Sequence, residues 1–583
     1  MKHNTNILLL FSMLLFGMTA CDSLLDKEPE TSRTESVTFN NANDFMLAAN
    51  YLYSWLPELY TDGVGLIDRD YDADIACEAS GTMSAISESS NGTSTTDSRY
   101  SNYYAHIRAI NELFANEYKI AEKSTINQYL AEAYFFRAYY SFMMFMDYGP
   151  LTIIKDVMDT NSPELYAARN SRDEFADFII QDLTDAIELQ ALPKEAELRN
   201  TSGEGRITIG AAQALLARVC LFEATWQKYH YNNQARANEL FQKAIAAAKE
   251  VMADDSYELF YNNALGYESY RYMFTLETDA QTNPANVKKN ANKEYILRKC
   301  FNENTAGDYL YTTGADKPYK TVASRKMVEM HLGSNGQPAT YDYVTSYTSF
   351  LENKDPRLAM NFLAPNSYTW SYANGRVDWQ NGSADLAQLK LRAASDLGYP
   401  NRKWVTERTV DTSKWGIDIP IIRLAEVYLT YAEAMYELNN AISDADLNIS
   451  INKLRNRVGM VPLTNSTVPN GSTMLDEIRR ERTVELYLEG HRLNDLRRWA
   501  TAKKEMSTNF EYLYVGTNSA FLKNRTDNGS NAGMPSAEST SEQGYAVKQQ
   551  AAKRQFKDRN YLLPLPTAQI ELNPNIEQNP GWE

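Results

Sequence analysis

The sequence is poor in cysteine and histidine, which limits the chemistry that it can carry. Its 583 residues include 4 cysteines and 5 histidines. Cys21 follows an apolar leader, and the remaining Cys77, Cys220 and Cys300 form no CxxC pair. This spacing argues against a disulfide framework and against a zinc site. We therefore expect no metal site and no metal cofactor, and we interpret Cys220, in a helical pattern, as a small core residue.

Positive charge is also scarce. Lysine and arginine number 58 against 75 acidic residues, which gives a net charge of −17 and a pI near 5.0. Proteins that bind a phosphate backbone need a basic surface, so we expect no nucleic-acid partner. The acidic surface mainly favours solubility and says little about the fold.

Familiar catalytic motifs are missing as well. The sequence has no HExxH, no P-loop, no GxSxG and no GxGxxG. A glycosidase remains open on the residues alone, because it needs only two carboxylates ~5 to 9.5 Å apart and sequence gives no such distance.

Only the N-terminus carries a hydrophobic run that stands out. Ile7–Phe16 is apolar, and Gly17–Ala20 leads directly into Cys21. The run is shorter than the ~18 residues of a membrane span. We interpret residues 1–20 as a bacterial lipoprotein signal peptide that frees Cys21 for acylation; the alternative is an ordinary secretory leader. The acidic, aperiodic residues 21–38 then predict a flexible tether, so the chain is anchored to a membrane without crossing it.

Helical periodicity dominates residues 39–260. Order is expected to begin near Asn40, where NANDFMLAANYLYSWL predicts a helix capped by Asn40 or Asn43. Further helices are predicted in residues 101–118, 126–149, 172–190, 208–227 and 236–254. Such pairs resemble tetratricopeptide-type hairpins, but their spacing is looser than the ~34-residue repeat. We predict a mainly α fold of degenerate helix pairs that stack against a second region.

That second region, residues 261–583, is less regular. Short helices are predicted in residues 322–332 and 355–363, and β-prone pieces in residues 294–301 and 402–409. Binding residues often lie on loops over a rigid frame, so we look for them here. Three tryptophans beside regular segments are assigned to the core: Trp404, Trp415 and Trp499.

The most strongly patterned stretch is Ile421–Trp499. Its first part has apolar residues at helical spacing: Leu424, Val427, Tyr428, Tyr431, Met435 and Leu438. Small residues among them allow a neighbouring helix to approach closely: Ala425, Ala432 and Ala434. Asp476 and Arg480 have the stabilising i,i+4 order. We expect Glu481, Arg482, Glu485 and Arg492 to pair with each other and with neighbouring helices.

Alternate acids from Asp68 to Asp74 raise a calcium hypothesis. An EF-hand loop beginning at Asp68 needs Gly at its sixth place and Glu at its twelfth, but these are Ala73 and Ala79. We favour a solvated acidic loop.

Several segments together resemble the SusD/RagB family of nutrient-binding outer-membrane lipoproteins. AEAYFFRAYYSFMMFMDYGPLTII looks like the family's helix that ends in a Tyr-Gly-Pro-Leu turn. RLAEVYLTYAEA, INKLRNRVGM and IRRERTVELYLEGHRLNDLRRW look like its central signature, and YLLPLPTAQIELNPNIEQNPGW is close to its usual ending. The matches keep the family order across residues 21–583. The resemblance implies a SusD-like fold.

The resemblance also implies a function. Such proteins lie on the cell surface, cap a SusC-like TonB-dependent transporter and deliver a ligand, usually an oligosaccharide, without catalysis. Asp22, Asp26 and Glu28 resemble the signal that directs these lipoproteins to the outer face of the outer membrane. A RagB-type protein with a peptide as its cargo is the alternative.

Sugar sites combine flat aromatic faces with hydrogen-bonding side chains, and three places in the chain offer both. Tyr100, Tyr104, Ile107 and Asn111 keep the spacing of the family's Trp-x3-Tyr-x2-Ile-x3-Asn pattern, with Tyr at the leading aromatic position. The alternative for each aromatic is core packing. The candidate ligand residues are Tyr100 and Tyr103; Tyr309, Tyr311, Lys317 and Tyr319; and Trp370, Tyr372 and Trp379.

Overall fold

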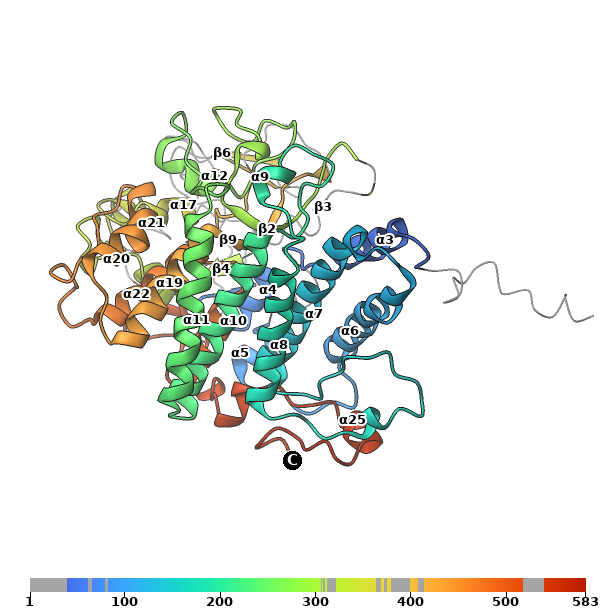
Figure 1. Cartoon of the computed structure of the whole chain (residues 1–583). Helices are drawn as coiled ribbons and strands as arrows, with labels where there is room; N and C mark the ends of the chain where they lie inside the picture. The colour runs from blue at the N-terminus through green and yellow to red at the C-terminus, as the bar shows by residue number, and fades with distance from the viewer. Residues whose placement is uncertain are drawn as a thin grey trace, which may run out of the picture.

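The computed structural model in Figure 1 describes most of the chain after the leader. The described residues are 39–60, 65–78, 82–305, 307, 310–311, 321–345, 347–362, 368–371, 375–378, 399–406, 414–516, 519 and 539–583. The predicted signal peptide, Cys21 and the tether therefore lie outside them. Within these ranges, no helix is both long enough and apolar enough to cross a membrane.

Long helices form the first half of the molecule, as predicted. They are α3 (Ala42–Tyr53), α6 (Ser98–Asn116), α7 (Asn127–Tyr148), α8 (Arg172–Glu188), α10 (Ile209–His230) and α11 (Gln234–Ala253). Figure 1 shows α8, α10 and α11 standing side by side, with α7 next to them. Each predicted helix is present, but α3 is capped by Asn41, whose side chain accepts from the backbone N–H of Asn43 and Asp44. The expected cap at Asn40 or Asn43 was wrong by one or two positions.

Shorter helices fill the rest of the chain. They are α4 (Leu66–Tyr71), α5 (Ala85–Glu88), α9 (Glu195–Leu198), α12 (Ser269–Tyr272), α15 (Arg325–Glu329), α16 (Tyr347–Leu351), α17 (Arg357–Asn361), α19 (Leu424–Asn439), α20 (Asp444–Ile449), α21 (Ile451–Arg457), α22 (Met474–Glu485), α23 (Arg492–Arg498), α24 (Ala502–Met506) and α25 (Thr567–Leu572). The mainly α prediction is confirmed.

The strands are short and pair antiparallel in small sheets. One sheet has the order β1–β4–β7 (Ala76–Glu78, Thr321–Ala323, Tyr399–Pro400), and another β10–β12–β11 (Phe510–Tyr514, Tyr545–Gln549, Ser539–Thr540). Three pairs complete the described strands: β2–β9 (Tyr295–Lys299, Ile419–Arg423), β3–β8 (Leu310–Tyr311, Lys414–Trp415) and β5–β6 (Tyr368–Ser371, Gly375–Asp378).

The predicted strand in residues 294–301 is present as β2, but the one in residues 402–409 is wrong in its described part. Residues 402–406 form a turn, in which Trp404 adopts a left-handed backbone (φ 69°). Its indole packs against Phe274 and donates to the carbonyl of Leu488 at 3.1 Å. Burial of this large ring therefore decides the local conformation. Trp404, Trp415 and Trp499 are all in the core, as predicted.

Helix α19 follows β9 and packs against α10, α11 and α22. Its small residues Ala425, Ala432 and Ala434 are fully buried, which confirms the close approach of neighbouring helices. The acids of α19 are buried too. Glu433 is paired with Arg498, and Glu437 with Lys228 at 2.9 Å. The helix is therefore enclosed on its polar face as well as its apolar one.

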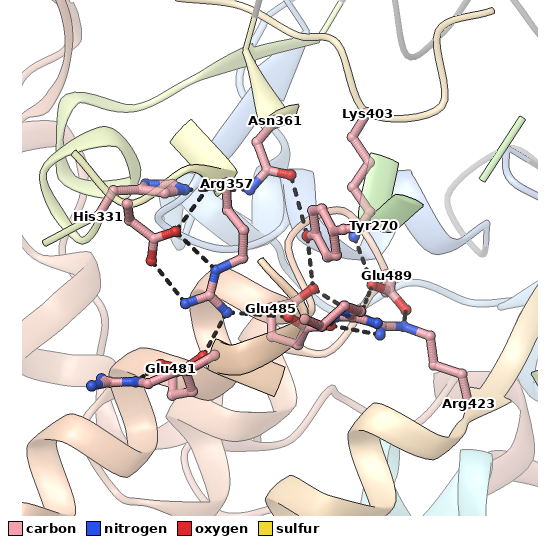
Figure 2. A network of polar contacts seen from close by, with 12 residues as sticks. Tyr270, His331, Arg357, Asn361, Lys403, Arg423, Glu481, Glu485 and Glu489 are labelled. Atoms are coloured by element: carbon pink, nitrogen blue, oxygen red, sulfur yellow. Dashed lines mark hydrogen bonds and ion pairs between the residues drawn. The ribbon is translucent and has the colours of Figure 1, made fainter. Parts of the chain in front are cut away.

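A buried ion cluster fixes the packing of the second half of the chain, and Figure 2 shows part of it. Its cations are Lys403, Arg357, Arg423, Arg455 and Arg457, and its carboxylates are Glu294, Asp355, Glu481, Glu485 and Glu489. The charges balance. The predicted pairing with neighbouring helices is confirmed for Glu481, Glu485 and Arg482, the last of which pairs with Asp495 of α23 at 2.8 Å. Arg492 pairs with Asp74, which lies between α4 and β1. None of the four pairs with another of the four.

The N-terminus of α22 corrects one predicted pair. Asp476 accepts from the backbone N–H of Thr473 at 2.9 Å and closes a capping box. Arg480 instead pairs with Glu477 at 3.1 Å. Capping competes successfully with the i,i+4 pair because the N–H groups at a helix start have no other partner.

The acid run is buried, so its interpretation as a solvated loop was wrong. Asp70 accepts from the N–H groups of Gly490 and Arg492, at 3.1 and 3.2 Å. Asp74 pairs with Arg492 at 2.8 Å and with Lys326 at 2.7 Å. These acids join α4 to the start of α23. Over the described residues, no group of three or more His, Cys, Asp or Glu side chains is placed to hold a metal ion.

Candidate functional site

The structure describes only some of the candidate ligand residues. Tyr309, Lys317, Tyr319, Tyr372 and Trp379 lie outside the described residues. The backbone of Tyr311 pairs with Lys414 in the β3–β8 ladder, and that of Trp370 pairs with Arg376 in the β5–β6 ladder. Only Tyr100 and Tyr103, at the start of α6, are described with their side chains.

Tyr100 lines a groove of about 410 Å³. One wall is the first half of α6, a second is the segment from Thr152 to Leu165 that follows α7, and the third is α25 with the chain after it (Figure 1). We call it the α6–α25 groove. Its size falls within the range of ordinary small-molecule sites.

The aromatic floor of the groove is built from Tyr100 and Tyr104. Their ring centroids are 5.1 Å apart, and Tyr100 meets the ring of Tyr148 edge-on at 5.4 Å. Tyr100 is only 5% exposed, whereas Tyr104 is half-buried, so a ligand reaches little of the Tyr100 ring. Burial raises the pKa of both hydroxyl groups, which are therefore neutral donors at physiological pH.

The start of α6 is fixed by Asp97, which lies just before the helix. Its carboxylate accepts from the backbone N–H of Arg99 at 2.9 Å and from the Tyr148 hydroxyl at 2.6 Å. A side-chain cap of this kind sets the residue at which a helix begins. The bond to Tyr148 also ties the start of α6, which carries Tyr100 and Tyr104, to the end of α7.

Tyr103 does not line the groove. Its side chain leaves α6 on a different face from Tyr100 and Tyr104 and is 8% exposed. Its hydroxyl accepts a hydrogen bond from Arg69 at 3.2 Å. Burial raises the pKa of this hydroxyl. The structure brings Tyr100 and Tyr104 together at the groove and places Tyr103 in the core.

Side chains of α6 hold the second wall by donating hydrogen bonds to its backbone carbonyl groups. Tyr104 donates to the carbonyl of Thr152 at 3.2 Å, Arg108 to that of Met158 at 2.6 Å, and Asn111 to that of Ile154 at 3.1 Å. Tyr104 and Asn111 of the sequence pattern therefore position this wall.

The third wall is tied to the second by asparagines of the C-terminal tail. Asn573 donates to the carbonyls of Leu165 and Ala167, at 3.1 and 2.9 Å, and Asn575 donates to that of Tyr166 at 2.8 Å. Sequence reasoning used this tail only for the family resemblance and missed its place in the site. The dense run of asparagines in ELNPNIEQNPG was the available signal, because asparagine readily bonds neighbouring backbone.

Three polar side chains on the groove are not engaged by the fold. Asp156 and Glu164 on the second wall and Gln569 on α25 line the groove, and in the described part of the chain their side chains make no hydrogen bond or ion pair. Sequence reasoning did not select any of them. The groove thus offers an aromatic floor with convergent polar groups, the arrangement that fixes the orientation of a small ligand.

Comparisons with known proteins agree on one family. A profile described as the SusD family matches residues 254–582, and one described as "Starch-binding associating with outer membrane" matches residues 25–221. A curated SusD-like protein from Bacteroides ovatus is 23% identical over 509 residues, which cover 85% of this chain and 82% of the relative.

Solved structures show the same fold. A SusD-like carbohydrate-binding protein from Bacteroides fragilis has a TM-score of 0.67 and 18% identity, with 92% of this chain and 99% of that chain covered. A second SusD-like protein from that organism has a TM-score of 0.66 and 22% identity, covering 93% and 97%. A laminarin-binding SusD-like protein has a TM-score of 0.54 and 18% identity, covering 93% and 99%.

The SusD family profile spans more than half of the chain. It includes α19, α22 and α23, the buried ion cluster, and the tail that forms the third wall of the groove. The chain belongs to the SusD family.

Proposed function

We propose that the protein is a glycan-binding lipoprotein of the cell surface that delivers its ligand to a SusC-like TonB-dependent transporter. The observation that carries the proposal is the α6–α25 groove, in which the rings of Tyr100 and Tyr104 meet free polar groups. Aromatic faces pack on sugar rings, and polar side chains bind the hydroxyl groups. Two structural neighbours, a carbohydrate-binding and a laminarin-binding SusD-like protein, support the same ligand class.

Anchoring is proposed through Cys21, acylated after removal of residues 1–20. Asp22, Asp26 and Glu28 then direct the protein to the extracellular side of the outer membrane. The family description "associating with outer membrane" supports this location.

The protein is proposed to bind without catalysis. The direct test incubates each glycan that binds with the purified protein and analyses the mixture for shorter products. Release of any product would identify a hydrolase instead.

Native electrophoresis through gels that contain one polysaccharide each tests the binding. We expect retardation by at least one glycan and a loss of retardation for Tyr104→Ala, with a smaller loss for Tyr100→Ala because a ligand reaches little of that ring. Tyr118→Ala is the matched control, because Tyr118 is 75% exposed and does not line the groove. Trp379→Ala tests one of the two other predicted ligand segments in the same gels. Unchanged mobility with every glycan in a broad panel contradicts the proposal.

The same partnership with a peptide cargo is the second candidate. Mass spectrometry of the ligand that co-purifies with the transporter complex separates the two, since a bound peptide would replace the glycan proposal and keep the delivery role.

A further inference from the structure

The free polar atoms of the α6–α25 groove are mostly acceptors. Asp156 and Glu164 present carboxylates, which can only accept hydrogen bonds when ionised, and Gln569 presents one carboxamide. They come from two separate segments of the chain and face a shared space. A ligand that satisfies these carboxylates must therefore donate hydrogen bonds.

Arg108 is a cation of the groove lining, and the fold uses only part of its exposed guanidinium. Arg108 donates from Nη1 to the carbonyl of Met158 at 2.6 Å, and its Nε lies 3.7 Å from Glu112. The ammonium group of Lys155 lies over the ring of Phe178, at 5.3 Å from its centroid. Arg108 therefore keeps part of its guanidinium for a ligand, whereas Lys155 is not among the residues that line the groove.

Arg169 is a further cation near the groove, and it joins the walls. It donates from Nε to the carbonyl of Pro150 at 2.7 Å, from Nη1 to that of Glu577 at 3.0 Å, and from Nη2 to Asn579 Oδ1 at 2.9 Å. Its partners are neutral oxygens, so its role is to hold the tail against the turn after α7.

Sugar hydroxyl groups suit such a site. A hydroxyl that donates to a carboxylate forms a charge-assisted hydrogen bond, about twice as strong as a neutral one. A ligand carboxylate or sulfate would instead face two like charges against the guanidinium of Arg108, on a protein of net charge −17. Like charges placed together in an interface exclude the wrong partner.

We infer that the α6–α25 groove selects uncharged or cationic glycans and rejects polyanionic ones, with Asp156 and Glu164 as the specificity-determining residues. This inference rests on the proposed function, because it names the ligand class of the same groove.

Matched pairs of polymers test it. Neutral polysaccharides, laminarin and pullulan among them, are compared with the same polymers after oxidation of their C6 hydroxyl groups to carboxylates, in affinity gels at constant ionic strength. We expect each neutral polymer that binds to lose about tenfold or more in affinity once it is carboxylated.

The double variant Asp156→Asn, Glu164→Gln is expected to lower the ratio of the affinity for the neutral polymer to the affinity for the carboxylated one. It should weaken binding of the neutral polymer and strengthen binding of the carboxylated polymer. The control Glu250→Gln, Glu258→Gln changes the net charge equally at exposed positions that do not line the groove, and should leave the ratio of the two affinities unchanged. An equal change in the control would overturn the assignment to these two residues.

The outcomes separate this inference from the proposed function. Carboxylated polymers that bind as tightly as their neutral parents would overturn the selectivity and leave glycan binding intact. If neither member of any pair binds, the proposed function and the selectivity both fall.

Discussion

Replacing Glu485 by glutamine removes one negative charge from the buried ion cluster and tests whether charge balance holds this region together. Glu485 is fully buried and pairs with Arg423 at 2.7 Å, with Arg357 at 3.1 Å, and with Arg457. Glutamine keeps the size of the side chain and one acceptor oxygen. The cluster would then hold one more positive charge than negative charges.

The expected cost follows from burial. Removing one partner of a buried ion pair leaves an uncompensated charge in a medium of low dielectric constant and costs about 3–5 kcal/mol. An exposed pair is worth only ~0.2–1 kcal/mol. Glu239→Gln is therefore the matched control, since Glu239 on α11 pairs with Lys243 at 3.0 Å and its side chain is 49% exposed.

Equilibrium unfolding in urea, followed by tryptophan fluorescence, measures both variants. We expect Glu485→Gln to lose several times more unfolding free energy than Glu239→Gln. Adding Arg457→Met to Glu485→Gln restores the balance of charges, and the double variant should recover part of the loss, which a double-mutant cycle quantifies. Equal effects of Glu485→Gln and Glu239→Gln would refute the reasoning.

Further predictions concern neighbouring charges and one cap. Burial raises the pKa of Asp70 to about 7, so the stability that its protonated form contributes is lost as pH rises through that value. Asp70→Asn should cost less than ~1 kcal/mol of unfolding free energy at pH 7. It should also flatten the pH dependence of stability in urea titrations. Asp74→Asn should cost about 3 kcal/mol in the same assay, because Arg492 and Lys326 hold the pKa of Asp74 below its usual range and lose their partner. Arg498 lowers the pKa of Glu433 to about 2 against the opposing effect of burial, so its contribution is complete above pH ~4.3 and is lost as pH falls through about 2; an acid titration of Glu433→Gln should lack that component. Asn41→Ala should destabilise the start of α3 by about 1 kcal/mol, seen as faster amide exchange in its first turn.

Local patterns in the sequence were sufficient for the long helices. The apolar periodicity of α7, α10 and α19 spans several turns, so each helix was predicted within a few residues. The cap of α3 was less certain, because Asn40, Asn41 and Asn43 all have a suitable side chain.

Partners far apart in the chain explain the wrong predictions. Asp70 finds its donor at Gly490, 420 residues later, so no local pattern could show that the acid run is buried. The turn at Trp404 likewise depends on Leu488, 84 residues away. Tertiary contacts of this kind override the propensity of the segment.

The site was predicted only in part. Tyr100 was identified through the spacing of the family pattern, and it does line the groove. The contribution of the tail was missed because Asn573 meets Ala167 across 406 residues. Asp156 and Glu164 belong to an irregular segment in which no periodicity distinguishes a residue that faces a ligand from one that faces solvent.

Hydrogen exchange with and without a bound glycan tests the central claim most directly, since it locates the ligand without changing a residue. The polysaccharide that most strongly retards the protein is added in excess, and exchange is followed along the whole chain. We predict added protection in three segments, residues 100–108, 152–165 and 569–576, which wall the α6–α25 groove. Protection that omits these segments and appears elsewhere would contradict the account.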